Sequence, residues 1–151
     1  MLLRKFAGPF AALAPEDRGL VAEALIFLCA IRLGLAIIPF PLLRRGLLRF
    51  GRVFRARHRV ASNPARIAWA VRLVAARLRS TGTCLPQALC GQLMLGRRGL
   101  PSQVGIGVSR TASGTIQAHA WLRAGGLVLL GGPSSHVAGF TQIAVLDGVG
   151  Q

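Results

Sequence analysis

Residues 81–89 read TGTCLPQAL and predict a helix that begins close to Cys84. Thr83 suits the N-cap, and Pro86 suits the first turn, where a missing backbone N–H costs nothing. Leucines follow at helical spacing at positions 85, 89, 93 and 95. The end of the helix is indicated by Arg97, Arg98, Gly99 and Pro101. A helix N-terminus favours an anion, so Cys84 is expected where a thiolate would be stabilised.

Residues 115–123 read TIQAHAWLR and predict a strand that carries His119. Side chains alternate between the faces of a strand, so Trp121 should lie on the same face as His119. An imidazole can take the proton of a thiol, and such partners are adjacent in space rather than in sequence. Cys84 and His119 are therefore a candidate nucleophile and general base. The alternatives are an inert, buried Cys84 and a His119 exposed on an ordinary sheet.

Three motifs occur in a specific order: CLPQAL at 84–89, LGRRGLPSQVGIGV at 95–108 and AHAWLRAGGLVLLGG at 118–132. Together they resemble the transglutaminase-like cysteine peptidase of lasso-peptide biosynthesis, the stand-alone catalytic half of the leader-processing B protein. The resemblance is close over residues 81–144, and the helical N-terminal part shares only the general character. It implies a papain-like or transglutaminase-like fold, with Cys84 as the nucleophile and His119 as the general base.

The same resemblance implies a function and a set of partners. The protein would remove the leader from a ribosomally made precursor peptide. A separate leader-binding protein would deliver that precursor, and an ATP-dependent macrolactam cyclase would then close the ring. The reaction would be amide hydrolysis through a thioester, with no metal or other cofactor. Two alternatives stay open: an acyltransferase on the same core, and a non-enzymatic basic module that binds an anionic membrane surface or an acidic partner.

One departure from the family pattern concerns the group that orients the histidine. The family usually has an aspartate shortly after the histidine, but Gly131 and Gly132 stand there. The groups expected to replace it are a backbone carbonyl, for which Gly131 is the candidate, or the side chain of Gln142 or Asp147. We expect a neutral acceptor for Nδ1–H, which leaves Nε2 toward the thiol. A Cys–His dyad without a third group, or an inactive homologue, would also be compatible with the two glycines. An aspartate at position 131 should raise the rate if the backbone tolerates a side chain.

The chain is strongly basic and apolar. It has 151 residues, 52% of them hydrophobic, and a net charge of +15 from 19 basic and 4 acidic side chains. Such a charge predicts attraction to anionic partners. The absence of Tyr and the few aromatic residues argue against a stacking platform for single-stranded nucleic acid, and no nucleic-acid partner is expected.

The three cysteines, Cys29, Cys84 and Cys90, are odd in number and lack the spacing of metal ligands. Cys84 and Cys90 lie six residues apart in one expected helix, too far to bridge each other. A reduced, cytoplasmic setting fits best. Cys29 and Cys90 fall on apolar helix positions and should be protected from reagents, which leaves Cys84 as the reactive thiol.

The N-terminal half predicts helices. Residues 1–15 lack the pattern of a secretory signal. Residues 20–38 are almost long and apolar enough to span a bilayer, but Glu23 and Arg32 argue against a span. A buried core helix is the favoured interpretation, and a membrane-associated hairpin is the alternative.

Residues 42–59 mix arginine with apolar residues. They predict an amphipathic helix whose arginines either are simply solvated or contact a membrane or an acidic partner. A further helix is expected over 64–78, with its apolar stripe at Ile67, Val71, Val74 and Leu78.

The sequence as a whole predicts an α+β fold in which the catalytic helix packs on a small antiparallel sheet. We expect one domain over 1–151, with a helical part at 1–80 and a catalytic core at 81–146. The expected strands are 103–108, 115–123, 127–130 and 140–146. Residues 131–135 are expected to form a loop, followed by His136 at the surface.

Overall fold

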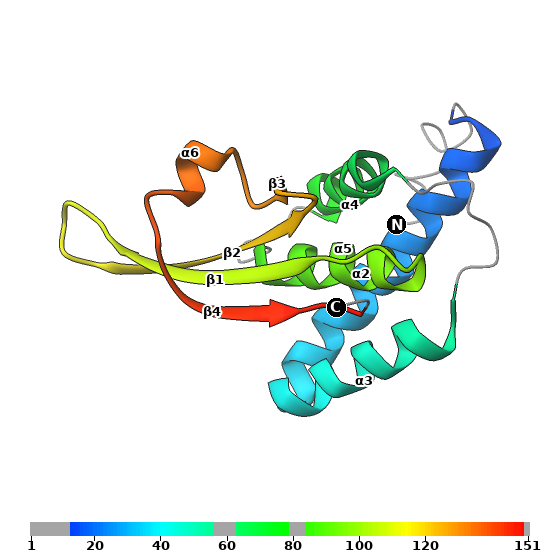
Figure 1. The fold of residues 1–151 in the computed structure, drawn as a ribbon, viewed down its shortest axis with the longest axis horizontal. Helices are drawn as coiled ribbons and strands as arrows, with labels where there is room; N and C mark the ends of the chain where they lie inside the picture. The colour runs from blue at the N-terminus through cyan, green and yellow to red at the C-terminus, as the bar shows by residue number, and fades with distance from the viewer. Residues whose placement is uncertain (1–12, 56–62, 79–83, 150–151) are drawn as a thin grey trace.

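The computed structural model describes residues 13–55, 63–78 and 84–149. The expected N-cap Thr83 lies outside the described residues, as do the arginines at 57 and 59. The longer helices precede the sheet, one short helix lies between the last two strands, and the α+β class is confirmed (Figure 1). The helices are α2 (Pro15–Ile37), α3 (Phe40–Val53), α4 (Pro64–Leu78), α5 (Cys84–Arg97) and α6 (Ser134–Val137). The strands are β1 (Gln103–Arg110), β2 (Ile116–Ala124), β3 (Leu127–Leu130) and β4 (Thr141–Asp147).

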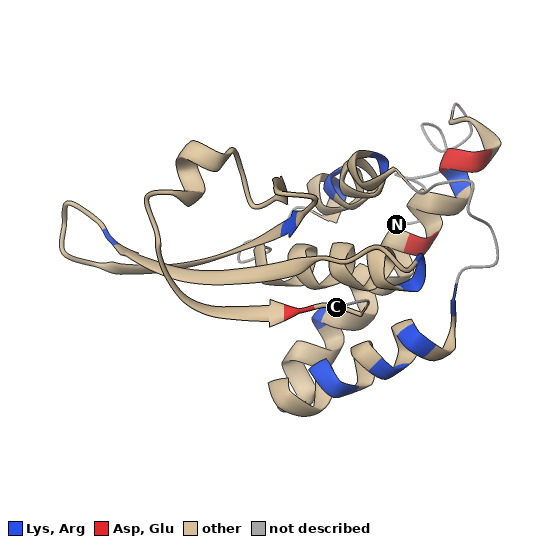
Figure 2. Cartoon of the chain, in the orientation of Figure 1, with Lys and Arg blue, Asp and Glu red and all other residues tan. Residues whose placement is uncertain are grey.

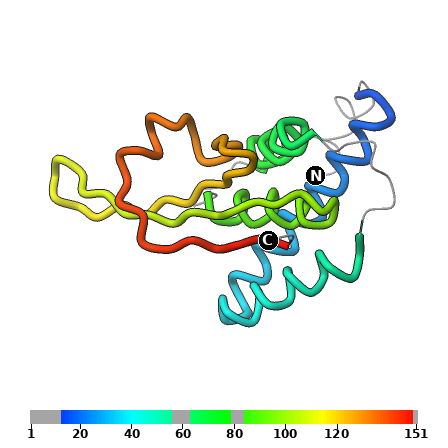
Figure 3. The backbone as a smooth tube through the Cα atoms, viewed as in Figure 1, coloured from blue at the N-terminus to red at the C-terminus, as the bar shows by residue number. Residues whose placement is uncertain are grey.

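The four strands form one antiparallel sheet in the order β3-β2-β1-β4. The turn between β1 and β2 extends beyond the helices, as the backbone trace makes clear (Figure 3). The chain leaves the edge strand β3 through α6 and reaches the opposite edge as β4 (Figure 1). β2 therefore has β1 along one side, and β3 covers only the end of its other side, with Leu122 opposite Leu130. This short pairing brings the residues that follow Leu130 beside the middle of β2.

Helix α5 is the centre of the fold. It contacts α2, α3 and α4 as well as strands β1, β2 and β3, and every residue from Ala88 to Gly96 is buried. Gly91 permits the close approach to the sheet, because a Cβ there would lie 2.6 Å from Leu122 and 2.8 Å from Leu130. These buried contacts fix the position of Cys84, which is the first residue of the helix.

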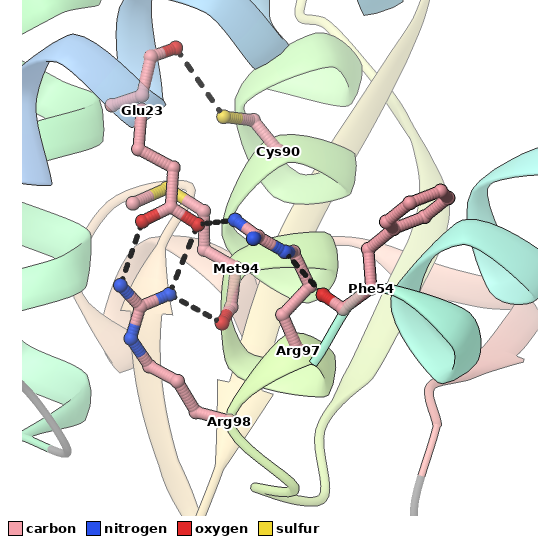
Figure 4. A network of polar contacts seen from close by, with 7 residues as sticks. Glu23, Phe54, Cys90, Met94, Arg97 and Arg98 are labelled. Carbon is pink, nitrogen blue, oxygen red and sulfur yellow. Dashed lines mark hydrogen bonds and ion pairs between the residues drawn. The ribbon is translucent and has the colours of Figure 1, made fainter. Parts of the chain in front are cut away.

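A polar network ties the C-terminal end of α5 to α2 and α3 (Figure 4). Glu23 of α2 accepts hydrogen bonds from Arg97 and from Arg98, whose Nη2 lies 2.7 Å from the carboxylate. Arg97 Nε also donates to the carbonyl of Phe54 at 2.8 Å. Two cations at a helix C-terminus complement its dipole, and the carboxylate of Glu23 compensates both. Glu23 in the apolar helix α2 is therefore compensated by two arginines in a partly buried network.

Helix α2 is only partly the core helix that the sequence predicts. One side is buried through residues such as Leu20, Ala24, Leu28 and Ile31, but the opposite side is apolar and exposed. Among the described residues, α2 is the one helix whose length and hydropathy would allow a membrane span.

Several boundaries differ from the sequence predictions. β1 extends to Arg110 rather than 108, and β2 and β4 each begin and end one residue later than expected. α3 begins at Phe40 rather than 42, because Pro41 is tolerated in a first helical turn. Its helical conformation ends at Val53, earlier than the expected 59. The expected loop after Gly131 contains the single helical turn of α6, which follows Pro133. The helix at 64–78 and the strand at 127–130 are confirmed without change.

Candidate active site

A cavity of about 500 Å³ lies where α5 begins, and both predicted catalytic residues line it. Cys84 reaches it from the first turn of α5, and His119 reaches it from β2. The remaining lining residues are Arg72, Gln87 and residues 128–133. The fold thus brings together two residues that are 35 positions apart in the sequence, as a Cys–His pair requires.

The imidazole of His119 is fixed by the backbone that follows β3. Its Nε2 lies 2.7 Å from the carbonyl oxygen of Gly131. A carbonyl can only accept, so Nε2–H donates and Nδ1 is the nitrogen that can take a proton from a thiol. The carbonyl acceptor agrees with the sequence hypothesis, but the assignment of the two nitrogens is wrong. The reason is geometric: the Gly131 carbonyl lies at the open side of β2, where the distal nitrogen of the ring reaches it.

No hydrogen bond joins Cys84 to His119 within the described part of the chain. Both side chains line the same cavity, but they are not hydrogen-bonded to each other. Catalytic hydrogen bonds are often long in proteins without substrate and tighten in the complex. The arrangement is therefore that of an open site, in which the base is already oriented.

Three aromatic rings surround the imidazole. Phe140 lies 5.0 Å from it between ring centroids, and Trp121 lies 6.3 Å away at an interplanar angle of 30°. His136 approaches edge-on at 5.2 Å. Trp121 is itself held against β1, where a Cβ at Gly105 would lie only 2.3 Å from its ring. The rings and the Gly131 carbonyl together restrict the orientations open to His119.

Gly131 cannot be replaced by a residue with a side chain at low cost. Its φ is +98°, a region that L side chains rarely adopt. A Cβ there would lie 2.6 Å from Cβ of Trp121 and 2.8 Å from the carbonyl of Ala120. An aspartate at position 131 is therefore no longer expected to raise the rate, because the backbone there does not tolerate a side chain.

Gln142 and Asp147 make no hydrogen bond to His119 among the described residues. Asp147 lies opposite Gln103, and its carboxylate accepts a hydrogen bond of 2.9 Å from that side chain. His119 lies opposite Gly107, four residues further along β1, or about 13 Å at the rise of a strand. Gln142 also lies opposite Gly107, but on the far side of β1. Distance along the sheet therefore separates Asp147 from the imidazole, and the width of β1 separates Gln142 from it.

Comparison with known proteins identifies the family. A family model described as the transglutaminase-like superfamily matches residues 25–145, which is most of the chain. The chain belongs to the transglutaminase-like superfamily. Proteins of this superfamily are generally enzymes, either cysteine peptidases or acyltransferases. No curated protein and no solved structure matches the chain significantly.

A transglutaminase-like enzyme needs a reactive thiol, and the three cysteines differ in environment. Cys84 is half-buried at the cavity wall. Cys90 is fully buried, and burial, with the nearby charges of Glu23 and Cys29, raises the pKa of its thiol far above the ordinary value. Cys29 is exposed, so the expectation that it is protected is wrong. Its apolar helix position faces outward, because the buried side of α2 is the opposite one.

Four residues of this transglutaminase-like site were not predicted from the sequence. Gln87 could have been found, because it follows Cys84 by one helical turn and so shares its face. Arg72 lines the cavity from α4 and donates to the carbonyl of Leu129 at 2.8 Å. His136 and Phe140 reach His119 only because the chain returns across the sheet after β3, and no local pattern indicates that return.

Proposed function

We propose that the protein is a cysteine peptidase that removes the leader from a lasso-peptide precursor. The observation that carries the proposal is the cavity shared by Cys84, at the start of α5, and His119, whose Nε2–H is held by Gly131. Membership of the transglutaminase-like superfamily supports a thiol-dependent peptidase or acyltransferase. The order of the three motifs around these residues supports the lasso-peptide role in particular.

The proposed reaction begins with proton transfer from the Cys84 thiol to Nδ1 of His119. The thiolate attacks the scissile carbonyl carbon, and a C–S bond forms. The C–N bond then breaks, and the leaving amine takes the proton from His119. Water attacks the thioester, the C–S bond breaks, and the thiol is restored with the acid product. Each step uses only groups that line the cavity, the peptide itself and water.

The negative charge that develops on the carbonyl oxygen needs hydrogen-bond donors. The first backbone N–H groups of a helix have no acceptor within the helix. At the start of α5 these include the N–H groups of Cys84 and Leu85, whereas Pro86 has none. We assign the oxyanion to this helix terminus, where the dipole also favours negative charge.

The proposed partners follow from the same role. A separate leader-binding protein would present the precursor, and an ATP-dependent macrolactam cyclase would act on the released core peptide. The net charge of +15 would favour encounter with an acidic partner or leader. All of these components would meet in the cytoplasm, where reduced cysteines persist.

The test is incubation of the protein with the precursor peptide, with and without the leader-binding protein, followed by mass spectrometry. Hydrolysis yields leader and core fragments whose masses sum to that of the precursor plus one water. A parallel reaction with an added primary amine distinguishes transfer, because the acyl fragment then carries the amine. Predominant amine adducts would favour the acyltransferase. No covalent change in either reaction, with a folded protein, would contradict both activities.

A further inference from the structure

Helices α2 and α3 carry many exposed apolar side chains, none of which lines the active-site cavity. We call this set the α2–α3 face and define it by the exposed residues Ile26, Leu33, Ile37, Ile38, Leu42, Phe50, Val53 and Phe54. Clusters of exposed apolar side chains are characteristic of sites that meet a protein or a membrane. A groove of about 430 Å³ runs between the two helices inside this face.

Two of the three most exposed members, Ile37 and Val53, lie outside the groove, as does Leu33, whereas Ile26 at 65% exposed lines it. Leu33, Ile37 and Val53 are 62%, 69% and 73% exposed. Ile37, together with the neighbouring Pro39 and Leu42, makes the tip of the α2–α3 hairpin apolar. A peptide or helix seated in the groove would leave these side chains in water. A broad apolar phase would cover all of them at once.

A row of arginines borders this face. Arg45, Arg49 and Arg52 recur at helical spacing along α3 and are exposed. Figure 2 shows that α3 carries several basic residues and no acidic residue. No hydrogen bond or ion pair to another described residue engages any of the three. Cations beside an exposed apolar stripe on one helix are the pattern of a helix that lies in a membrane interface.

The acidic side chains of the chain do not balance these arginines. Asp17 pairs with Arg66, and Glu23 pairs with Arg97 and Arg98. Asp147 accepts its hydrogen bond from Gln103, and Glu16 stands in the first turn of α2. The face therefore has one sign of charge, which complements an anionic surface and would repel a second copy of itself.

We propose that the α2–α3 face docks the protein on an anionic lipid surface. The apolar side chains of α2 and α3 enter the boundary between headgroups and acyl chains, and the three arginines contact the lipid phosphates. Helix α4 and strand β3, which contribute to the active-site cavity, lie on the opposite side of the fold from α3 (Figure 1). The cavity thus stays open to a dissolved peptide while the protein is bound.

The test is co-sedimentation of the purified full chain with two kinds of vesicle. One is phosphatidylcholine alone, and the other contains about 30% phosphatidylglycerol. We expect binding to the anionic vesicles that weakens as salt is raised, and little binding to the neutral ones. The combined variant Arg45→Gln, Arg49→Gln, Arg52→Gln should bind the anionic vesicles on the order of 100-fold more weakly.

Two control variants distinguish the contribution of this face to vesicle binding from a general effect of net charge or exposed apolar residues. Arg66→Gln, Arg110→Gln, Arg123→Gln removes the same three charges elsewhere and should bind within a few-fold of wild type. Ile37→Ser, Val53→Ser should weaken binding more than tenfold, whereas Ile116→Ser, Leu127→Ser changes equally exposed residues of the sheet and should not. Circular dichroism confirms that each variant is folded.

Three outcomes would overturn the proposal. One is equal vesicle binding by the α3 arginine variant and its charge-matched control. Another is the absence of binding of wild type to anionic vesicles at low salt. The third is a stable dimer in sedimentation velocity that the Ile37→Ser, Val53→Ser variant abolishes, because the face would then belong to a second copy.

Discussion

Among single residues, Gly131, the glycine after β3, has the largest effect on how His119 is held. Gly131 has a positive φ, holds His119 through its carbonyl and leaves no room for a Cβ beside Trp121. Gly126 also has a positive φ, but no atom lies near its absent Cβ. The two positions therefore separate the cost of backbone conformation from the cost of the clash.

We predict that Gly131→Ala lowers the free energy of unfolding by about 3 kcal/mol or more, since strain and overpacking add. Gly126→Ala should cost only about 1 kcal/mol, because strain acts alone there. Urea denaturation measures both. Gly131→Ala should also slow peptide cleavage under conditions where it is fully folded, because its carbonyl would shift. Equal stabilities for the two variants would contradict the close contact with Trp121.

The cysteines give a second residue-scale prediction. With iodoacetamide at neutral pH, Cys84 should react fastest, because a helix N-terminus favours the thiolate. Cys29 should react at the rate of an ordinary exposed thiol, and Cys90 should react only after unfolding, since burial raises its pKa and blocks access. Timed labelling followed by peptide mapping measures all three rates. Fast labelling of Cys90 in the folded protein would contradict the buried position.

At the scale of secondary-structure elements, the ion pairs of Glu23 hold α2 against α5. The side chain of Glu23 is 15% exposed and those of Arg97 and Arg98 are 19% and 8% exposed, so removal of the carboxylate leaves two largely buried cations without an anionic partner. We predict that Glu23→Gln lowers the free energy of unfolding by about 3 kcal/mol.

Asp17→Asn is the matched control, because it removes the acid of an ion pair whose Arg66 is 49% exposed. Asp17→Asn should lower the free energy of unfolding by less than about 1 kcal/mol. Chemical denaturation of both variants measures the two changes in free energy of unfolding. A cost for Glu23→Gln no larger than that for Asp17→Asn would mean that α2 is held by apolar packing alone.

The positions of the helices and strands show which parts of the fold could be predicted from the sequence. The helix that starts at Cys84 and the strand of His119 follow from local signals, namely Pro86, the leucine spacing and the alternation around His119. The C-terminal limit of α3 does not, because the residues beyond Val53 continue the same mixture of arginine and apolar residues. The exposed side of α2 was not expected either, because a helix that is apolar all round gives no local signal of which side is buried.

The group that orients the imidazole of His119 depends on packing between segments that are distant in the sequence. A carbonyl acceptor at Gly131 could be anticipated from the missing aspartate, but the choice of Nε2 depends on where β3 ends beside β2. The contacts of His136 and Phe140 with His119 depend on the path from β3 to β4. Such long-range contacts have no counterpart in local spacing, so sequence patterns alone did not indicate them.

At the scale of the whole molecule, the high net charge bears on how substrate arrives. We predict that cleavage of the precursor is slow with this protein alone and rises strongly with the leader-binding protein. The gain should fall as salt is raised from about 50 to 300 mM, because exposed attraction is screened over such a range. Initial rates by mass spectrometry at several salt concentrations measure it. A partner-dependent rate that is indifferent to salt would rule out charge as the cause.

The proposed role of Cys84 as the nucleophile of a peptidase can be tested by comparing three forms of the protein. Precursor and leader-binding protein are incubated with wild type, Cys84→Ala or Cys29→Ala, and leader release is followed by mass spectrometry. Cys29→Ala is the control, because it also replaces one accessible thiol but lies outside the cavity. We predict cleavage at the wild-type rate for Cys29→Ala and no detectable cleavage for Cys84→Ala, with both variants folded. Cleavage by Cys84→Ala at the wild-type rate would contradict the assignment.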